Sequence, residues 1–179
     1  FHEWQRAEDV IRWCRQIRNI DKDSFFLILS NEKPEKIYDI FFRHKIKEVE
    51  LLIKSVSCLE VPKLLSIADL GLLPRRRLKV NEVASPLKLS EYLAAGVPVL
   101  ATPFVDQVGK FIIENQKTGF LTNSVNPQNW NSKTGSGLSK FIGLIKRNRR
   151  ELAHLCHISA INNFSWVRSA ELLKMLYSD

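Results

Sequence analysis

The segment SPLKLSEYLAAGVPVLAT, at residues 85–102, constrains the fold of this chain more than any other. Ser85 is a favourable N-cap, Pro86 suits the first helical position, and Gly96 is a typical helix end. Apolar runs typical of buried strands flank the segment, at 68–73 and 98–101. The segment therefore predicts a strand, a loop, a helix of about ten residues and a second strand of a parallel sheet.

The start of this helix has the chemistry of an anion site. In a parallel unit the helix N-terminus points to the crevice at the carboxyl ends of the strands, where its N–H groups and dipole favour phosphate. Ser85, Lys88 and Glu91 are spaced by three, so they share one stripe of the helix. A lysine can bind a diphosphate, and a carboxylate can accept hydrogen bonds from ribose hydroxyls. Spacing alone leaves open a surface helix with a solvated lysine and glutamate.

Four short runs of sequence surround this helix: LPR at 73–75, VNEVA at 80–84, SPLK at 85–88 and EYLAAGVPV at 91–99. Together they resemble the donor-binding motif of the family 4 retaining glycosyltransferases, in particular their bacterial surface-polysaccharide branch. Weaker matches extend the resemblance over most of the chain, at Asp69, 117–121 and 164–166.

The resemblance implies that the chain is the C-terminal, nucleotide-sugar-binding half of an enzyme of the GT-B fold. It implies that Glu91 holds the ribose of the donor. It also implies that Lys88 holds the diphosphate together with the helix start, formed by Ser85, Pro86 and Leu87.

One position departs from the family pattern. Many members have a second glutamate eight positions before the ribose glutamate, where it contacts the transferred sugar, and this chain has Val83 there. Glu82 is one residue out of register, so it is a candidate catalytic residue on position alone. The departure leaves diphosphate binding as expected and leaves the sugar contacts undefined.

The net charge of +8 suits phosphate-bearing ligands, acidic lipids or nucleic acid, and by itself does not distinguish them. Three arginines, Arg75, Arg76 and Arg77, lie on the loop that leads to the helix. Arg75 is closest to the strand end, so it is the one predicted to contact phosphate. A second basic cluster is predicted to be a solvated helix face, at Lys146, Arg147, Arg149 and Arg150.

Amphipathic stripes typical of helices alternate along the chain with short apolar runs. Strands are expected at 25–29, 49–56, 68–73, 98–101 and 119–121, and helices at 7–17, 34–44 and 61–67 as well as after residue 85. This alternation predicts a doubly wound, Rossmann-like α/β fold with helices on both faces of a parallel sheet, and 179 residues suit one domain. The GT-B resemblance implies a strand before the first helix, so we expect the chain to lack its first strand and the N-terminal acceptor-binding half.

The C-terminal third is predicted to be a loop followed by helices. Residues 123–137 are rich in Asn and Gly, so 134–137 are expected to be a connector and not a phosphate cradle. Two successive helices are expected over 138–162. A last helix at 164–179 is expected to be capped by Ser165. Its inward side chains are expected to be Trp166, Ala170, Leu173 and either Leu176 or Tyr177.

No metal or cofactor site is expected. His154, Cys156 and His157 lie close in sequence, but no fourth ligand is near and a helix would separate them. Three widely spaced cysteines argue against a disulfide framework. With no signal-peptide pattern and no long apolar run, the expected location is the cytoplasm, with peripheral association of the full-length protein at the inner face of the membrane.

The sequence therefore predicts a glycosyltransferase domain that binds a nucleotide-diphosphate sugar and supports transfer to a glycan or lipid-linked acceptor. Its expected partners are the donor and the N-terminal acceptor domain of the same enzyme, without which it should be inactive. A sugar-nucleotide epimerase of GT-B architecture is one alternative. A basic nucleic-acid-binding module is another, although no known motif supports it, so nucleic acid is not an expected partner.

Overall fold

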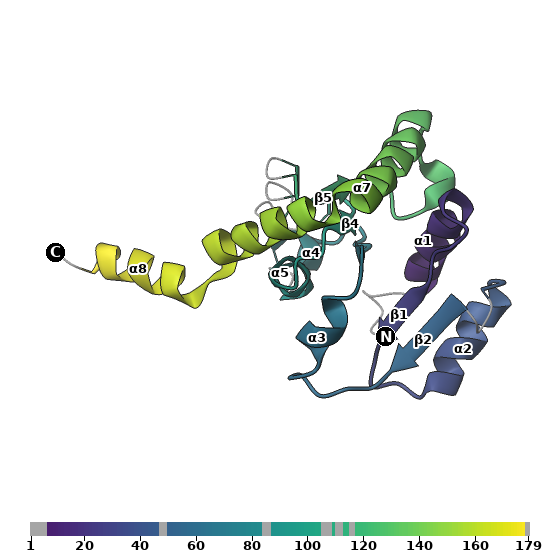
Figure 1. Cartoon of the computed structure of the whole chain (residues 1–179), viewed down its shortest axis with the longest axis horizontal. Coiled ribbons are helices and arrows are strands. Elements are labelled where there is room, and N and C mark those ends of the chain that lie inside the picture. The colour runs from purple at the N-terminus through teal and green to yellow at the C-terminus, as the bar shows by residue number, and fades with distance from the viewer. Residues whose placement is uncertain are drawn as a thin grey trace.

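The structure is a computed structural model, and most of the chain is described by it (Figure 1). The described residues are 7–46, 50–83, 87–104, 109, 113–114 and 117–177.

The first part of the chain is built from α1 (Ala7–Ile20), β1 (Phe26–Leu29), α2 (Pro34–Arg43) and β2 (Leu51–Lys54). β1 and β2 are parallel, with Phe26 opposite Leu51 and Leu29 opposite Lys54. The apolar stripe of α1, which includes Trp13, is buried as the helical period requires. Of the two adjacent phenylalanines at the start of β1, Phe26 is buried and Phe25 is exposed.

The second part holds the segment that the sequence singled out. Its elements are α3 (Val61–Leu65), β3 (Gly71–Leu73), α4 (Lys79–Val83), α5 (Leu87–Ala94), β4 (Val99–Ala101) and β5 (Gly119–Leu121). The three strands are parallel in the order β3–β4–β5. α5 ends as predicted, since Gly96 has the positive φ of +73° that favours glycine after a helix. The short helix α4 was not predicted.

The described strands form two parallel sheets, β1–β2 and β3–β4–β5. Within the described residues β1 pairs with β2 alone and β3 with β4 alone, so no described strand joins β1 to β3. The two parts nevertheless share a core, because Phe26 and Ile53 of the first sheet belong to the same buried cluster as Leu100 of the second. The predicted α/β class, with parallel strands and helices, is confirmed.

Helices cover both faces of the second sheet, as predicted. Alternate residues of β4 point to opposite faces. Val99 and Ala101 pack in a cluster with Leu89 and Leu93 of α5. Leu100 packs in the other cluster, which includes residues of α1 and of the first half of the long helix α7.

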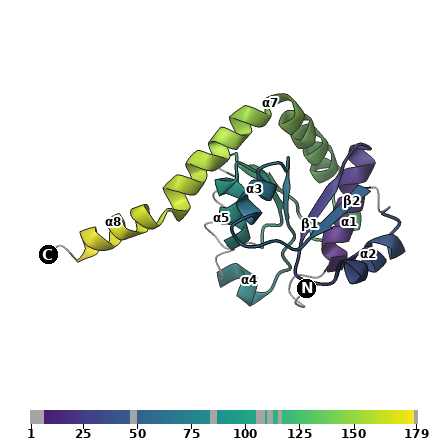
Figure 2. The ribbon, with the colours of Figure 1, turned by 60° about the horizontal axis from the view of Figure 1, so that its bottom comes forward.

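The C-terminal third is more helical than predicted. After η3 (Pro127–Asn129), α7 runs over Ser132–Phe164 and is kinked at Asn148, where φ is −125° and ψ is 33°. Residues 134–137, predicted to be a connector, are therefore helical. The reason is local, because the Asn131 side chain caps the helix by accepting a hydrogen bond of 2.7 Å from the Thr134 N–H. The two successive helices predicted over 138–162 correspond to the parts of α7 on either side of the kink at Asn148, and α7 arches over the sheet (Figure 2).

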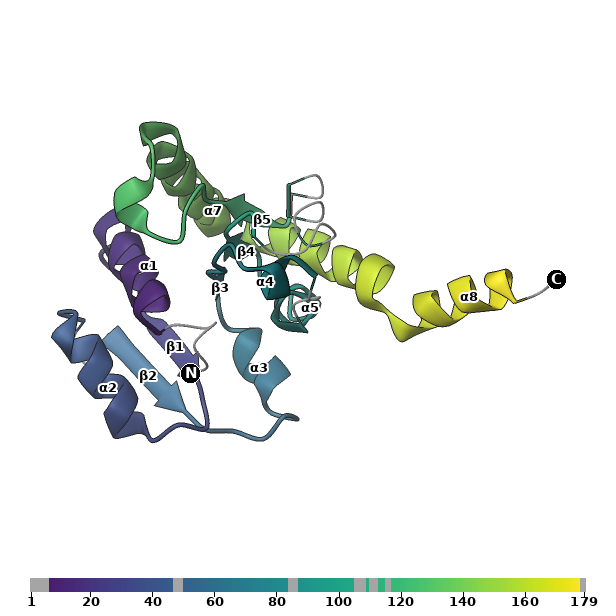
Figure 3. The same cartoon turned by 180° about the vertical axis from the view of Figure 1, so that it is seen from behind.

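α8 (Trp166–Leu176) projects away from the rest of the molecule in both opposite views (Figures 1 and 3). Its predicted cap is confirmed, since the Ser165 side chain accepts a hydrogen bond from the Val167 N–H. Its predicted packing is wrong, because Trp166 is 88% exposed and Tyr177 is 83% exposed. The apolar pattern of α8 specifies a face to be covered, and no described element lies opposite it.

The second basic cluster is only partly a solvated face. The Lys146 ammonium lies 2.8 Å from the Asp21 carboxylate, at the turn after α1. The Arg149 guanidinium contacts the Asp69 carboxylate and donates to two carbonyl groups that follow α3. Charge spacing on one helix could not reveal these partners, which come from distant parts of the chain. Among the described residues, no helix is long and apolar enough to cross a membrane.

Candidate functional site

Arg75 lies just after the carboxyl end of β3, and its residue surface is only 9% exposed. Its backbone is fixed by Thr102, which follows β4. The Arg75 N–H donates to the Thr102 hydroxyl over 3.0 Å, and that hydroxyl donates to the Arg75 carbonyl over 2.6 Å. The Arg75 guanidinium donates to the Asn81 side-chain carbonyl over 3.5 Å. The ends of the two strands and α4 therefore hold this arginine.

Burial governs the electrostatics around Arg75. Desolvation lowers the pKa of Arg75, and the nearby Tyr92 phenol opposes that shift. Desolvation also raises the pKa of Tyr92 to about 12, helped by the charge of Glu91 and opposed by the Leu72 N–H and Arg75. An arginine stays protonated under these conditions. The Arg75 cation and the Glu91 carboxylate therefore both act on the pKa of the Tyr92 phenol, where β3 meets α5.

Gly71 allows Tyr92 to lie against β3. A Cβ atom at position 71 would lie 2.7 Å from the Tyr92 ring, closer than real Cβ contacts allow. The absence of a side chain at Gly71 therefore lets α5 pack closely on the strand that leads to Arg75.

Arg76 is held differently from Arg75. Its guanidinium donates to both oxygens of Asp9 over 2.8 and 3.0 Å, and Asp9 is 3% exposed. The bidentate pair raises the pKa of Arg76, chiefly through the hydrogen bond to Asp9. Because Asp9 belongs to α1, the pair ties the loop after β3 to the first helix, and the charge of Arg76 is matched within the protein.

Lys88 and Glu91 lie one turn apart on α5, and both are exposed. Leu89 and Leu93, on the opposite side of α5, are fully buried and fix its orientation. In the part of the chain that the structure describes, neither the Lys88 ammonium nor the Glu91 carboxylate forms a hydrogen bond or ion pair. Both groups are available to a ligand.

Several predicted positions fall partly or wholly outside the described residues. Ser85 and Pro86 are not described. The side chains of Glu82 and Val83 are not described either, although their backbone forms part of α4. Leu87 begins α5 and is 76% exposed.

Sequence reasoning missed the residues that position the predicted ones: Asp9, Asn81, Tyr92 and Thr102. Thr102 gave a usable signal, because it is a polar residue at the carboxyl end of a buried strand. Asn81 and Asp9 gave none, because their roles depend on contacts with Arg75 and Arg76 that no spacing rule indicates.

A family model for group 1 glycosyl transferases matches residues 1–139. The chain belongs to the group 1 glycosyltransferases. The predicted resemblance is thereby confirmed at the level of the family. The alternatives of an epimerase and of a nucleic-acid module are not favoured.

Individual relatives of this glycosyltransferase chain agree with the family. It is 44% identical over 43 residues to TuaH of Bacillus subtilis (strain 168), named as a teichuronic acid biosynthesis glycosyltransferase, a match covering 24% of this chain and 11% of TuaH. The crystal structure of WaaG, a glycosyltransferase involved in lipopolysaccharide biosynthesis, has the same fold, with a TM-score of 0.59, 17% identity and 97% of this chain covered. A glycosyltransferase of Rickettsia africae ESF-5 gives a TM-score of 0.62, 18% identity and 99% coverage. The chain spans 42% and 46% of those two solved chains.

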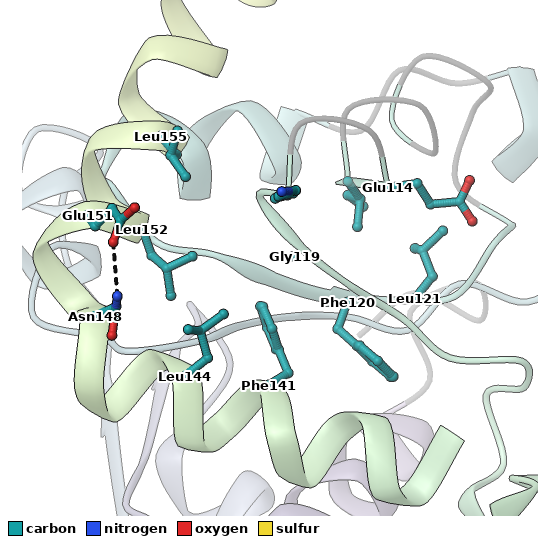
Figure 4. A pocket seen from close by; sticks show the side chains of 12 residues that line it. Glu114, Gly119, Phe120, Leu121, Phe141, Leu144, Asn148, Glu151, Leu152 and Leu155 are labelled. Atoms are coloured by element: carbon teal, nitrogen blue, oxygen red, sulfur yellow. Dashed lines mark hydrogen bonds between the residues drawn. The ribbon is translucent and has the colours of Figure 1, made fainter. Parts of the chain in front are cut away.

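A cavity of about 520 Å³ lies elsewhere on this glycosyltransferase chain, between β5 and the kink of α7 (Figure 4). Phe120, Phe141 and Leu152 line its apolar part, and at its rim Asn148 donates a hydrogen bond of 2.9 Å to Glu151. None of the predicted site residues lines this cavity. It is therefore distinct from the site around Arg75 and α5.

At 154–157, Cys156 is buried in α7, whereas His154 and His157 are exposed. Within the described ranges, no three His, Cys, Asp or Glu residues lie close enough together to bind a metal ion.

Proposed function

We propose that the chain is the donor-binding part of a retaining glycosyltransferase and that the site between β3 and α5 binds a nucleotide-diphosphate sugar. The observation that carries the proposal is Arg75, a cation that is 9% exposed at the carboxyl end of β3 and interacts electrostatically with Tyr92 of α5. Membership of the glycosyltransferase family supports this choice of ligand.

In the proposed site, different residues contact the diphosphate and the ribose of the donor. Lys88 and Arg75 are the cations for the diphosphate, and the first turn of α5 adds N–H groups from its start at Ser85, Pro86 and Leu87. Glu91, one turn further along, accepts hydrogen bonds from the ribose hydroxyls. The i, i+3 spacing of Lys88 and Glu91 matches a ligand whose ribose follows its phosphates.

The same cations serve the reaction. The diphosphate is the leaving group, so negative charge grows on its oxygens as the bond to the sugar breaks. Fixed positive charge at that place stabilises the transition state more than the ground state. Arg75 and Lys88 supply this charge from the protein, so the proposed reaction needs no metal. Glu82 is kept as a candidate for contacting the transferred sugar.

The acceptor and the cellular setting are inferred from relatives. TuaH is named for teichuronic acid and WaaG for lipopolysaccharide, which supports a bacterial surface glycan as the product. The acceptor would bind to an N-terminal domain of the same enzyme, in the cytoplasm or at the inner face of the membrane. The present chain alone is then expected to bind donor without transferring sugar.

Calorimetric titration without divalent metal tests the proposal. UDP or GDP should bind more tightly than the matching monophosphate, by about tenfold or more, because the second phosphate gains charged hydrogen bonds. Lys88→Ala should reduce this preference. Lys140→Ala, which removes an exposed lysine of α7, should not. Equal affinity for diphosphate and monophosphate would contradict the proposal, and salt-sensitive binding of RNA without a nucleotide preference would favour a nucleic-acid module.

A further inference from the structure

We infer that Asn81 is a positioning residue, which holds the Arg75 guanidinium in the site without neutralising it and so leaves its charge for an anionic group of the ligand. The inference rests on the proposed function, in which that anion is the diphosphate of the donor. It adds a residue and a reason for its chemistry that the family resemblance does not supply.

Asn81 is 4% exposed and forms hydrogen bonds to two of the three arginines of the loop, Arg75 and Arg76. Its side-chain carbonyl accepts from the Arg75 guanidinium over 3.5 Å, and its side-chain NH₂ donates to the Arg76 carbonyl over 2.9 Å. Its backbone N–H donates to the Leu78 carbonyl over 2.8 Å, in the first turn of α4. Only an amide makes both side-chain contacts together, because a carboxylate could accept from Arg75 but cannot donate to the Arg76 carbonyl.

The two adjacent arginines, Arg75 and Arg76, differ in whether an acidic side chain neutralises their charge. Arg76 has a bidentate carboxylate, Asp9. Arg75 is the more buried of the two, yet among the described residues the 3.5 Å contact with neutral Asn81 is the only hydrogen bond of its side chain. Buried charges in proteins are normally paired, and an unpaired one is costly. An anion beside Arg75 would offset that cost, so the site favours an anionic ligand before any contact with Lys88 is counted.

Hydrogen bonds at both ends of the Arg75 residue, to its backbone and to its guanidinium, keep the guanidinium in place when no ligand is bound. The Thr102 hydroxyl bonds both the N–H and the carbonyl of Arg75, which fixes the start of the side chain. Asn81 fixes its end. A cation held in this way loses little conformational freedom on binding, and preorganised charge is what stabilises a leaving phosphate most effectively.

Asn81→Asp tests the inference, because it keeps the shape of the side chain and places a carboxylate beside Arg75. We expect the affinity for UDP or GDP to fall by about tenfold or more while the affinity for the monophosphate changes less, because the new carboxylate occupies Arg75. A merely structural asparagine predicts an unchanged affinity ratio. The melting temperature does not separate the two cases, because the bond to the Arg76 carbonyl is lost in both. Asn129→Asp, at an exposed position of η3, controls for the added charge.

A double-mutant cycle provides the second measurement. Asn81→Ala and Arg75→Gln should each lower the diphosphate affinity, and Asn81→Ala should have no further effect when Arg75 is already replaced. Additive losses would overturn the inference, and so would an unchanged ratio in Asn81→Asp while the unaltered chain prefers diphosphate. If the unaltered chain shows no such preference, the proposed function itself fails, and the inference fails with it. If Asn81→Asp does not fold, the cycle with Asn81→Ala decides the question.

Discussion

At the scale of single residues, the loop after β3 shows how a short basic run acquires separate roles. Arg76 is neutralised by Asp9 and anchors the loop to α1, whereas Arg75 is buried beside an amide. The sequence predicts that one arginine of the triplet faces the ligand and that Arg75 is the best placed. It could not indicate why the neighbouring arginine differs, because Asp9 lies 67 residues away in the sequence.

Glu91→Gln tests the ribose contact in the proposed site. Glutamine keeps the shape of the side chain and removes its charge, and charged hydrogen bonds contribute about 1.5–3 kcal/mol each. We expect nucleotide-diphosphate affinity to fall by about tenfold or more, with little change in melting temperature because Glu91 is exposed. The 2′,3′-dideoxy nucleotide should bind equally to both proteins. Equal losses for the ribo and dideoxy ligands would exclude a direct ribose contact.

Gly71→Ala tests the packing that brings α5 against β3. The new methyl group would lie 2.7 Å from the Tyr92 ring, so the helix or the ring must shift. Overpacking of this kind costs about 1–3 kcal/mol, and urea unfolding should report the loss. Gly135→Ala is the matched control, since that position is helical and nothing lies within 4 Å of the added carbon. The control should be neutral or stabilising by up to about 1 kcal/mol. A similar loss of unfolding free energy in both variants would indicate that the packing of α5 does not depend on the contact between Gly71 and Tyr92.

At the scale of helices and strands, local signals in the sequence predicted the type of an element better than the residues at which it begins and ends. α5 and β4 follow from the Gly96 stop and the apolar run after it, both of which are local. α7 begins earlier than predicted, because the Asn131 cap and the bond from the Thr134 hydroxyl to Asn123 outweigh two glycines in its first turns. α4 was missed because no spacing rule indicates the bond from the Asn81 side chain to the Arg76 carbonyl, which accompanies this helix.

The ion pair between α7 and the turn after α1 gives a pH-dependent test. The hydrogen bond to Lys146 lowers the pKa of Asp21 below its ordinary value of 3.8. A carboxyl group with a lowered pKa in the folded state adds stability above its unfolded pKa, and this contribution is lost as the pH falls through the folded value. We expect Asp21→Asn to lower the melting temperature modestly at neutral pH, because the Lys146 side chain of the pair is 57% exposed to solvent.

The difference between Asp21→Asn and the unaltered chain should shrink as melting curves are recorded at progressively lower pH, below about 4. Asp23→Asn, at an exposed neighbouring position, should show a smaller effect. A difference that is constant from neutral to acid pH would mean that the ion pair does not act as the geometry indicates.

At the scale of the whole molecule, two sheets share one core and a kinked helix spans the second sheet and reaches beyond it. The alternation of helices and strands predicts the α/β class, because each apolar stripe needs a sheet face to cover. It does not by itself give the order of the strands, which depends on pairing between strands and not on the pattern of any one strand. Nor does it predict the position of α8. The apolar pattern of α8 indicates that one face of the helix is to be covered, but it does not indicate which element covers that face.

Removal of α8 tests how far the fold depends on that helix. Truncation after Phe164 takes away Trp166, Leu173 and Tyr177, all of them mostly exposed, so little buried surface is lost. We expect the free energy of unfolding to change by less than about 0.5 kcal/mol, measured by urea unfolding. Leu152→Ala, at a position of α7 that is 5% exposed, should cost about 2–5 kcal/mol in the same assay. A loss on truncation as large as that of Leu152→Ala would mean that α8 buries its apolar face in solution. A loss that grows with protein concentration would place that face against a second copy of the chain.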